Sequence, residues 1–257
     1  MKRHITYIAM LLTALTGASC SQDETPVGDG RTGVMAMTIS TSRAEDNGEY
    51  DPLQYQKVYI YNSEGGLLRK YAAKEDIPER LELLSGTYRV AVEAGEEVPA
   101  DFSKRFYKGE ETFTVKPGET THAEVVCKIA NTVVEVKFDA SIVENLDPGY
   151  FVWIAGTDKF DEAEAESGAV PALKFTDEGT GYYTLPAGTT SLAWMFRGTH
   201  TSGKEVEMEN TLTEVKAGGK YVFTFRYSPD LPGYIDALLI RVDTETEDKD
   251  DEIIFSP

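Results

Sequence analysis

Strict alternation of apolar and polar side chains is the feature that most limits what this chain can fold into. Val206 and Met208 alternate with glutamates, and the same period of two returns at Val134, Val136 and Phe138. A period of two places every second side chain on one face of a β-strand, whereas an amphipathic helix needs a period near 3.6. Such runs recur between Gly- and Pro-containing turns. This arrangement is typical of antiparallel sandwiches and argues against β–α–β units.

The alternating runs predict strands in two consecutive sets, and helix only as one or two turns within 158–167 and 76–80. The first set covers 34–39, 57–61, 67–71, 80–84, 87–92, 111–115 and 121–129; the second covers 133–138, 151–155, 172–175, 182–185, 191–197, 204–212 and 220–227. Two further strands, 234–242 and 253–255, flank an acidic loop at 243–252. We therefore predict an all-β protein of two consecutive antiparallel β-sandwich domains, residues 33–130 and 131–257.

The N-terminus has the composition of an export signal. Lys2 and Arg3 precede a mostly apolar, uncharged stretch from Ile5 to Ala18. At ~1.5 Å per residue, this stretch spans roughly 21 Å as a helix, short of the ~30 Å hydrocarbon core of a bilayer. Residues 1–19 are therefore predicted to be a signal peptide rather than a transmembrane anchor.

The signal peptide ends at a cysteine that can carry a lipid. The run Leu15-Thr16-Gly17-Ala18-Ser19-Cys20 resembles a bacterial lipoprotein box, although Gly17 stands where Leu is usual. Cys20 is the predicted lipidation site, and residues 20–32 form a lipidated tether. The acids just after Cys20 resemble the export signal of Bacteroidetes surface lipoproteins, which predicts an outer-membrane protein exposed at the cell surface. Ordinary secretion with an incidental cysteine, or a tether facing the periplasm, are the alternatives.

The charge and the reactive residues exclude several functions. The chain has 44 acidic and 25 basic residues, a net charge of −19, so nucleic acid is not an expected partner. Acylation of Cys20 leaves Cys127 as the only thiol, and its alternating run predicts a small buried residue. We predict no catalytic, cofactor-binding or metal site, and hence no enzyme.

Three short motifs remain open to other interpretations. Gly198–Lys204 matches most of a phosphate-binding loop, but strands flank it, which favours a hairpin loop. The acidic loop 243–252 loosely resembles a calcium-binding loop, and the alternative interpretation is an ordinary solvated loop. Arg43 is either a processing site, by analogy with fimbrial precursors, or an ordinary loop residue.

Four runs of residues carry a family resemblance. They are Leu84–Val90, Phe106–Gly109, Val126–Val134 and Gly218–Phe225. The sequence resembles an uncharacterised Bacteroidetes surface-lipoprotein family related to fimbrillin, fimbrial-anchor and fimbrial-tip proteins. The resemblance implies transthyretin-like or immunoglobulin-like sandwiches and a role in adhesion or pilus assembly. It carries no catalytic or binding residues to this chain.

These features predict a surface-anchored adhesin or a fimbria-like tip, anchor or accessory subunit that acts through sheet edges and loops. Its expected partners are the membrane, through the lipid, and fimbrial subunits, a host protein or a glycan. A carbohydrate- or peptide-binding surface lipoprotein is the alternative function, and a hydrolase ranks last. Exposed aromatic residues in a cleft would favour the alternative.

Overall fold

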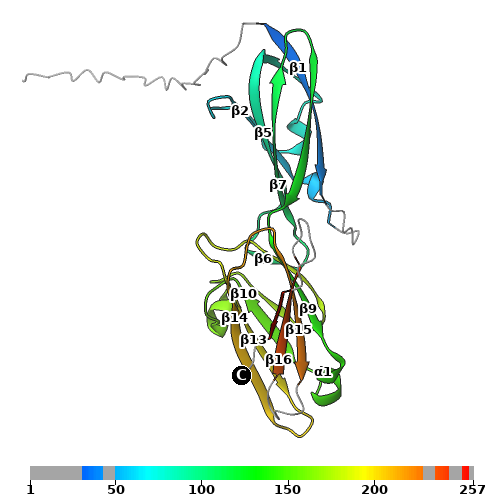
Figure 1. Cartoon of the computed structure of the whole chain (residues 1–257), viewed down its shortest axis with the longest axis vertical. Helices are drawn as coiled ribbons and strands as arrows, with labels where there is room; N and C mark the ends of the chain where they lie inside the picture. The colour runs from blue at the N-terminus through cyan, green and yellow to red at the C-terminus, as the bar shows by residue number, and fades with distance from the viewer. Residues whose placement is uncertain (1–30, 43–49, 228–234, 243–250, 255–257) are drawn as a thin grey trace, which may run out of the picture.

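The computed structural model describes residues 31–42, 50–227, 235–242 and 251–254 of the 257-residue chain, the last two ranges as backbone. Strands dominate the described residues and the helices are short, which confirms the all-β class. Figure 1 shows the strands gathered in two groups that follow one another along the long axis.

The N-terminal strand group is a single seven-stranded sheet. Its spatial order is β3 (Leu67–Tyr71), β2 (Gln56–Asn62), β5 (Gly86–Gly95), β7 (Phe106–Val115), β8 (Thr120–Ile129), β1 (Thr32–Thr41) and β4 (Arg80–Leu84). β7 pairs with β8 only near the open end of their hairpin, away from the turn, at Tyr107–Ile129 and Lys108–Lys128. The halves on either side of this junction share one core, which includes Val90 from β5 and Val125 from β8.

The C-terminal strand group consists of two sheets. The four-stranded sheet has the order β11 (Ala172–Phe175), β10 (Phe151–Ala155), β13 (Leu192–Thr199) and β14 (Glu205–Leu212). The six-stranded sheet has the order β17 (Asp251–Ile254), β16 (Ile235–Val242), β15 (Lys220–Tyr227), β9 (Thr132–Phe138), β12 (Gly179–Tyr183) and β6 (Ala100–Asp101). One cluster joins Trp194 of the first sheet to Phe225 of the second, so the two sheets pack face to face.

Two strand pairs are parallel, so the expectation of purely antiparallel sheets is wrong. β1 runs parallel to β8, and β9 runs parallel to β15. In both cases the partners are separated by several other strands along the chain. Alternation assigns side chains to a face of a sheet but says nothing about the direction of the neighbouring strand.

The strand β6 crosses between the groups. It lies in sequence between β5 and β7, yet it pairs with β12 of the six-stranded sheet. At the other crossing, β8 ends at Ile129 and β9 begins at Thr132. Asn131 between them is fully buried; its Oδ1 accepts a hydrogen bond from the Phe106 backbone N–H, and its Nδ2 donates to Thr184 Oγ1 at 3.3 Å. The alternation pattern predicted neither β6 nor this contact.

The hairpin between β2 and β3 shows how local sequence sets the register. Asn62 Oδ1 accepts hydrogen bonds from the backbone N–H groups of Glu64 and Gly66, at 3.0 and 2.6 Å. Gly65 adopts φ +86°, a left-handed conformation that glycine tolerates best. Along β2 the side chains alternate between buried and partly exposed, as the sequence predicted.

In the described part of the chain, four short helices connect the strands. They are the 3-10 helices η1 (Pro52–Gln54) and η2 (Lys74–Asp76), and the α-helices α1 (Ala140–Asn145) and α2 (Glu162–Ser167). α2 lies within the predicted segment 158–167, and η2 overlaps the start of the predicted segment 76–80. α1 was not predicted, because it is a single capped turn: Asp139 Oδ1 accepts a hydrogen bond from the Ser141 backbone N–H at 3.0 Å.

Candidate functional site

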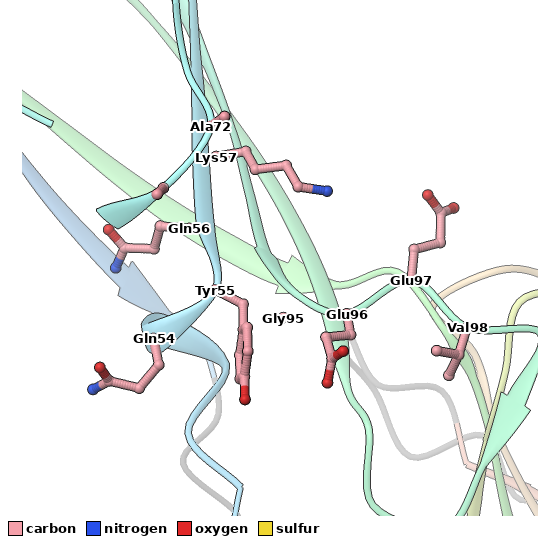
Figure 2. Close-up of a pocket in the computed structure, with 10 residues that line it drawn as sticks. Gln54, Tyr55, Gln56, Lys57, Ala72, Gly95, Glu96, Glu97 and Val98 are labelled. Carbon is pink, nitrogen blue, oxygen red and sulfur yellow. The ribbon is translucent and has the colours of Figure 1, made fainter. Parts of the chain in front are cut away.

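A pocket of about 420 Å³ lies where β2 begins and β5 ends (Figure 2). We call it the Tyr55 pocket. Its lining residues are Gln54, Tyr55, Gln56, Lys57, Ala72, Ala73, Gly95, Glu96, Glu97 and Val98. This volume falls within the ~300–1,000 Å³ that is typical of small-molecule sites.

The turn before β2 positions Tyr55. Asp51 caps η1, where its Oδ1 accepts a hydrogen bond from the Leu53 backbone N–H at 2.9 Å. Its Oδ2 accepts a second hydrogen bond, from Gln54 Nε2 at 2.8 Å. The hydrogen bond from Gln54 is the main reason why the pKa of Asp51 lies below its usual value. The capped turn therefore delivers Tyr55 in a fixed orientation.

Gly95 forms the opposite wall of the pocket. Its backbone N–H donates a hydrogen bond to the Tyr55 carbonyl oxygen at 3.2 Å. Gly95 has φ +92°, and a Cβ at this position would collide with the carbonyl oxygen of Arg105. Only glycine at position 95 therefore allows the end of β5 to approach the backbone of Arg105 this closely.

Tyr50 supports Tyr55 from one side. The two rings stack with centroids 5.7 Å apart and planes 13° apart. The Tyr50 hydroxyl accepts a hydrogen bond from the Glu96 backbone N–H at 2.7 Å, and its carbonyl oxygen accepts one from Arg105 Nη2 at 2.7 Å. Burial raises the pKa of Tyr50 above its usual value. Tyr55 itself remains 49% exposed, although Tyr50 covers one of its faces.

The charged residues of the pocket lie in balanced pairs. The nitrogen-to-oxygen distances are 4.0 Å for Lys57 with Glu93, 3.3 Å for Lys104 with Glu96, and 3.9 Å for Lys108 with Glu97. Surface pairs of this kind each contribute only ~0–1 kcal/mol to stability. They leave the pocket polar but without an excess of either charge.

The sheet edges are the second candidate surface. In the described sheets, the terminal strands are β3 and β4, β11 and β14, and β17 and β6. β14 has its glutamates exposed and Val206 buried, which confirms the predicted alternation there. β3 instead exposes the cations Arg69 and Lys70. Unpaired backbone groups at such edges can hydrogen-bond to a strand from another chain.

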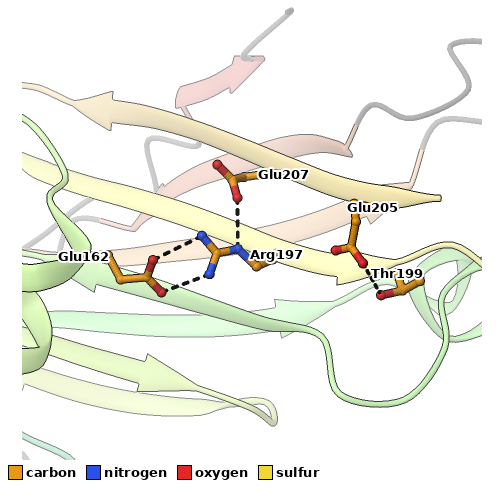
Figure 3. Close-up of polar contacts among 5 residues, drawn as sticks. All are labelled: Glu162, Arg197, Thr199, Glu205 and Glu207. Atoms are coloured by element: carbon orange, nitrogen blue, oxygen red, sulfur yellow. Dashed lines mark hydrogen bonds and ion pairs between the residues drawn. The ribbon is translucent and has the colours of Figure 1, made fainter. Parts of the chain in front are cut away.

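Arg197 connects the edge of the four-stranded sheet to α2 (Figure 3). Its Nη1 and Nη2 donate to the two carboxylate oxygens of Glu162 at 3.0 and 3.1 Å, and its Nε donates to Glu207 at 2.9 Å. These hydrogen bonds raise the pKa of Arg197 above its usual value. They hold α2 over a small apolar cluster on the outer face of the sheet, which contains Ala165 and Met195.

The structure describes only some of the residues that the sequence singled out. Cys20, Arg43 and residues 243–250 of the acidic loop lie outside the described residues. Cys127 is fully buried and not bonded to another cysteine, as predicted, and burial raises its pKa to about 11. No group of three or more His, Cys, Asp or Glu side chains among the described residues could hold a metal ion. Within the same residues, no helix is long and apolar enough to cross a membrane.

The segment that resembles a phosphate-binding loop is a hairpin loop. β13 ends at Thr199 and β14 begins at Glu205. The His200 backbone N–H donates to the Lys204 carbonyl oxygen at 2.8 Å, and Gly203 adopts φ +83°. The helix that a phosphate-binding loop needs does not follow Lys204, because a strand does. The prediction of a hairpin loop is confirmed.

Sequence reasoning did not single out the Tyr55 pocket, although the sequence holds one signal of it. Tyr59 and Tyr61 lie on the side of β2 that points away from the core, because Val58 and Ile60 are buried, and Tyr55 continues the same alternation in the sequence just before this strand. A row of aromatic residues on the outward phase of an alternating strand is unusual for a solvated face.

The sequence places the chain in a family. Residues 32–257 match the family described as "Domain of unknown function (DUF4493)", so the chain belongs to this family. No curated protein matches the sequence.

The chain is similar to solved structures over most of its length. A fimbrial assembly protein from Parabacteroides distasonis has 13% sequence identity and a TM-score of 0.51; the match covers 87% of this chain and 98% of that one. The fimbrial anchor protein Mfa2 from Porphyromonas gingivalis has 9% identity and a TM-score of 0.39, with 80% and 97% of the two chains covered. The resemblance to fimbrial proteins of Bacteroidetes is thus confirmed at the level of the fold.

Proposed function

We propose that the chain is a non-enzymatic cell-surface lipoprotein, held in the outer membrane through Cys20, that acts as an adhesin or a fimbria-like subunit. One observation carries the proposal: the fold agrees with that of a fimbrial assembly protein over 98% of the length of that protein. The acidic residues after Cys20 and the signal peptide support the location.

The sheet edges support action by association. β3 exposes Arg69 and Lys70, whereas β14 exposes Glu205, Glu207 and Glu209. Opposite charges on two edges steer approaching strands and disfavour pairing of an edge with its own copy. We infer that these edges and the neighbouring loops contact fimbrial subunits or a host protein.

The proposal includes the division of the chain. Residues 33–130 and 131–257 are taken as two consecutive β-sandwich domains of transthyretin-like or immunoglobulin-like style. The separate core clusters of the two strand groups support this division. The pairing of β6 with β12 means that residues 100–101 join the sheet of the second domain.

The location is tested on intact cells. We expect added protease to remove the protein from the cell surface, and an alkyne analogue of palmitate to label it. Cys20→Ala should abolish the label, whereas the matched variant Cys127→Ala should keep it. Labelling of Cys20→Ala, or full protection from protease on intact cells, would contradict the proposal.

The subunit role is tested with photo-crosslinking residues on the same cells. Lys70 on β3 should give cross-links to another surface protein, whereas Lys116, on the turn between β7 and β8, serves as the exposed control. Equal cross-linking at both positions would remove β3 from the proposed contact surface.

A further inference from the structure

Tyr55, just before β2, differs from Tyr59 and Tyr61, the outward tyrosines of that strand, in having an open ring surface. Lys70 Nζ lies 5.6 Å from the Tyr59 ring centroid, and the Arg89 guanidinium lies 4.2 Å from that of Tyr61. Within the described residues, no cation lies over Tyr55, which is 49% exposed. A ring that is left open at the wall of a pocket is available to a ligand.

The open ring is also rigidly placed. Tyr50 stacks on one face of Tyr55, and the backbone of Gly95 is hydrogen-bonded to the carbonyl oxygen of Tyr55. A side chain that is already ordered loses little conformational entropy when a ligand binds to it. This favours Tyr55 as a preformed contact surface.

Polar side chains line the pocket beside and beyond the ring. In Figure 2, Tyr55 and Glu96 extend in the same direction, and Lys57 and Glu97 lie further along the pocket. Carboxylates accept hydrogen bonds and an ammonium group donates them, so the wall offers both kinds of partner to hydroxyl groups. An apolar ring beside such partners matches a ligand with one C–H-rich face and a hydroxylated rim.

The charges decide between classes of such ligands. The lining residues Lys57, Glu96 and Glu97 each have a partner of opposite charge within 4.0 Å. The chain as a whole carries a net charge of −19, which repels anions. Both facts favour an uncharged ligand over a sialylated or sulfated one.

We propose that the Tyr55 pocket binds a neutral saccharide, with one sugar ring stacked on the open surface of Tyr55. The hydroxyl groups of that ring exchange hydrogen bonds with Lys57, Glu96 and Glu97. The inference goes beyond the proposed surface role and does not rest on it, because it concerns the binding of a saccharide by the purified protein.

The test is binding of the purified protein to an array of neutral, sialylated and sulfated glycans, followed by titration with the neutral oligosaccharide that gives the strongest signal. We expect Tyr55→Ala to weaken binding about tenfold, which corresponds to ~1.4 kcal/mol. Tyr55→Phe keeps the ring and should bind within about twofold of the wild type, since rings of both kinds stack. The matched control is Tyr61→Ala, an outward tyrosine of the adjoining strand β2, and it should leave binding unchanged.

Melting curves of all variants separate a lost contact from a lost fold. Tyr55→Ala is expected to melt near the wild-type temperature, because half of the side chain is exposed. The proposal is overturned by an array without neutral binders, by a preference for charged glycans, or by Tyr55→Ala binding as tightly as the wild type. Equal losses of binding in Tyr55→Ala and Tyr61→Ala would also overturn it. A further contrary result would be that the protein binds a glycopeptide equally well before and after the glycan is removed.

Discussion

The two strand groups differ in how many aromatic side chains their cores contain. In the C-terminal group, rings such as Trp194 and Phe225 are fully buried and pack edge to face, with centroids 5.3 Å apart. The core cluster of the N-terminal group is mostly aliphatic and contains fewer rings, Tyr88, Tyr107 and Phe113, whereas Tyr55 is exposed outside it.

This difference indicates what each group contributes. Burying a large apolar side chain stabilises a fold by ~1.5–3 kcal/mol, and an exposed ring forgoes most of that gain. The C-terminal group therefore gains more stability from its rings, whereas the N-terminal group leaves the ring of Tyr55 exposed. We regard the C-terminal group as the more strongly stabilised of the two and the N-terminal group as the one that carries the Tyr55 pocket.

The largest effect is expected from shortening the C-terminal group. β16 pairs with β15 from Lys220 to Tyr227, so a chain that ends at Ser228 lacks β16 and β17 and leaves β15 at an open edge. We expect the C-terminal group to lose most of the ~5–15 kcal/mol that is typical of a domain and to aggregate. Calorimetry should still show unfolding of the N-terminal group. An unchanged melting profile would mean that β16 and β17 do not stabilise the sheet.

Core substitutions sharpen the comparison. Phe225→Ala should cost ~3–5 kcal/mol and Ile60→Val ~0.5–1.5 kcal/mol, because each leaves a cavity in its own core. If the groups unfold separately, calorimetry should show Phe225→Ala lowering one transition and Ile60→Val the other. A single transition that both variants lower would show one cooperative unit and would contradict a domain boundary near Asn131.

Cys127 reports on the N-terminal group alone. Burial raises its pKa to about 11, so at pH 8 the thiol of the folded protein stays protonated and inaccessible. In a Cys20→Ala background we expect slow reaction with a thiol reagent in the folded state. The reaction should accelerate on unfolding or as the pH rises toward 11. Fast labelling of the folded protein at pH 8 would contradict the buried position, and Phe225→Ala should not speed labelling if the groups are independent.

The smallest effect concerns Arg197. Arg197→Lys keeps the charge but loses the paired hydrogen bonds to Glu162, so we expect a loss of about 0.5–1 kcal/mol in urea unfolding. Limited proteolysis should then cut more readily near α2. Arg89→Lys is the comparison variant in the N-terminal group, where Arg89 has one ion pair, with Glu110 at 3.0 Å, and a cation–π contact with Tyr61. If Arg197→Lys lowers the free energy of unfolding no more than Arg89→Lys does, the stability of α2 does not depend on the hydrogen bonds from Arg197.

The alternation pattern predicted faces and strand positions well, because both follow from local sequence. The bounds of β10, β11 and β15 agree with the predicted segments 151–155, 172–175 and 220–227. The partner and direction of a strand depend on contacts far away in sequence, so the parallel pairing of β1 with β8 was missed. β6 was missed because two residues are too few to show a period.

The candidate site was predictable only in part. The outward tyrosines of β2 were visible in the sequence, but their accessibility depends on which neighbours cover them. Arg89 of β5 lies over the ring of Tyr61. Gly95, at the end of the same strand, donates a backbone hydrogen bond to the carbonyl oxygen of Tyr55. Such contacts come from tertiary structure, and no spacing of residues in the sequence encodes them.

The detour of the chain through β6 has a mechanical consequence. The polypeptide leaves the N-terminal group after Gly95, pairs with β12, returns as β7 and leaves again after Ile129. Tension applied along the long axis is therefore shared by three covalent connections, and Asn131 adds hydrogen bonds to both sides of the joint. A joint built this way should resist twisting and hinging of one strand group against the other.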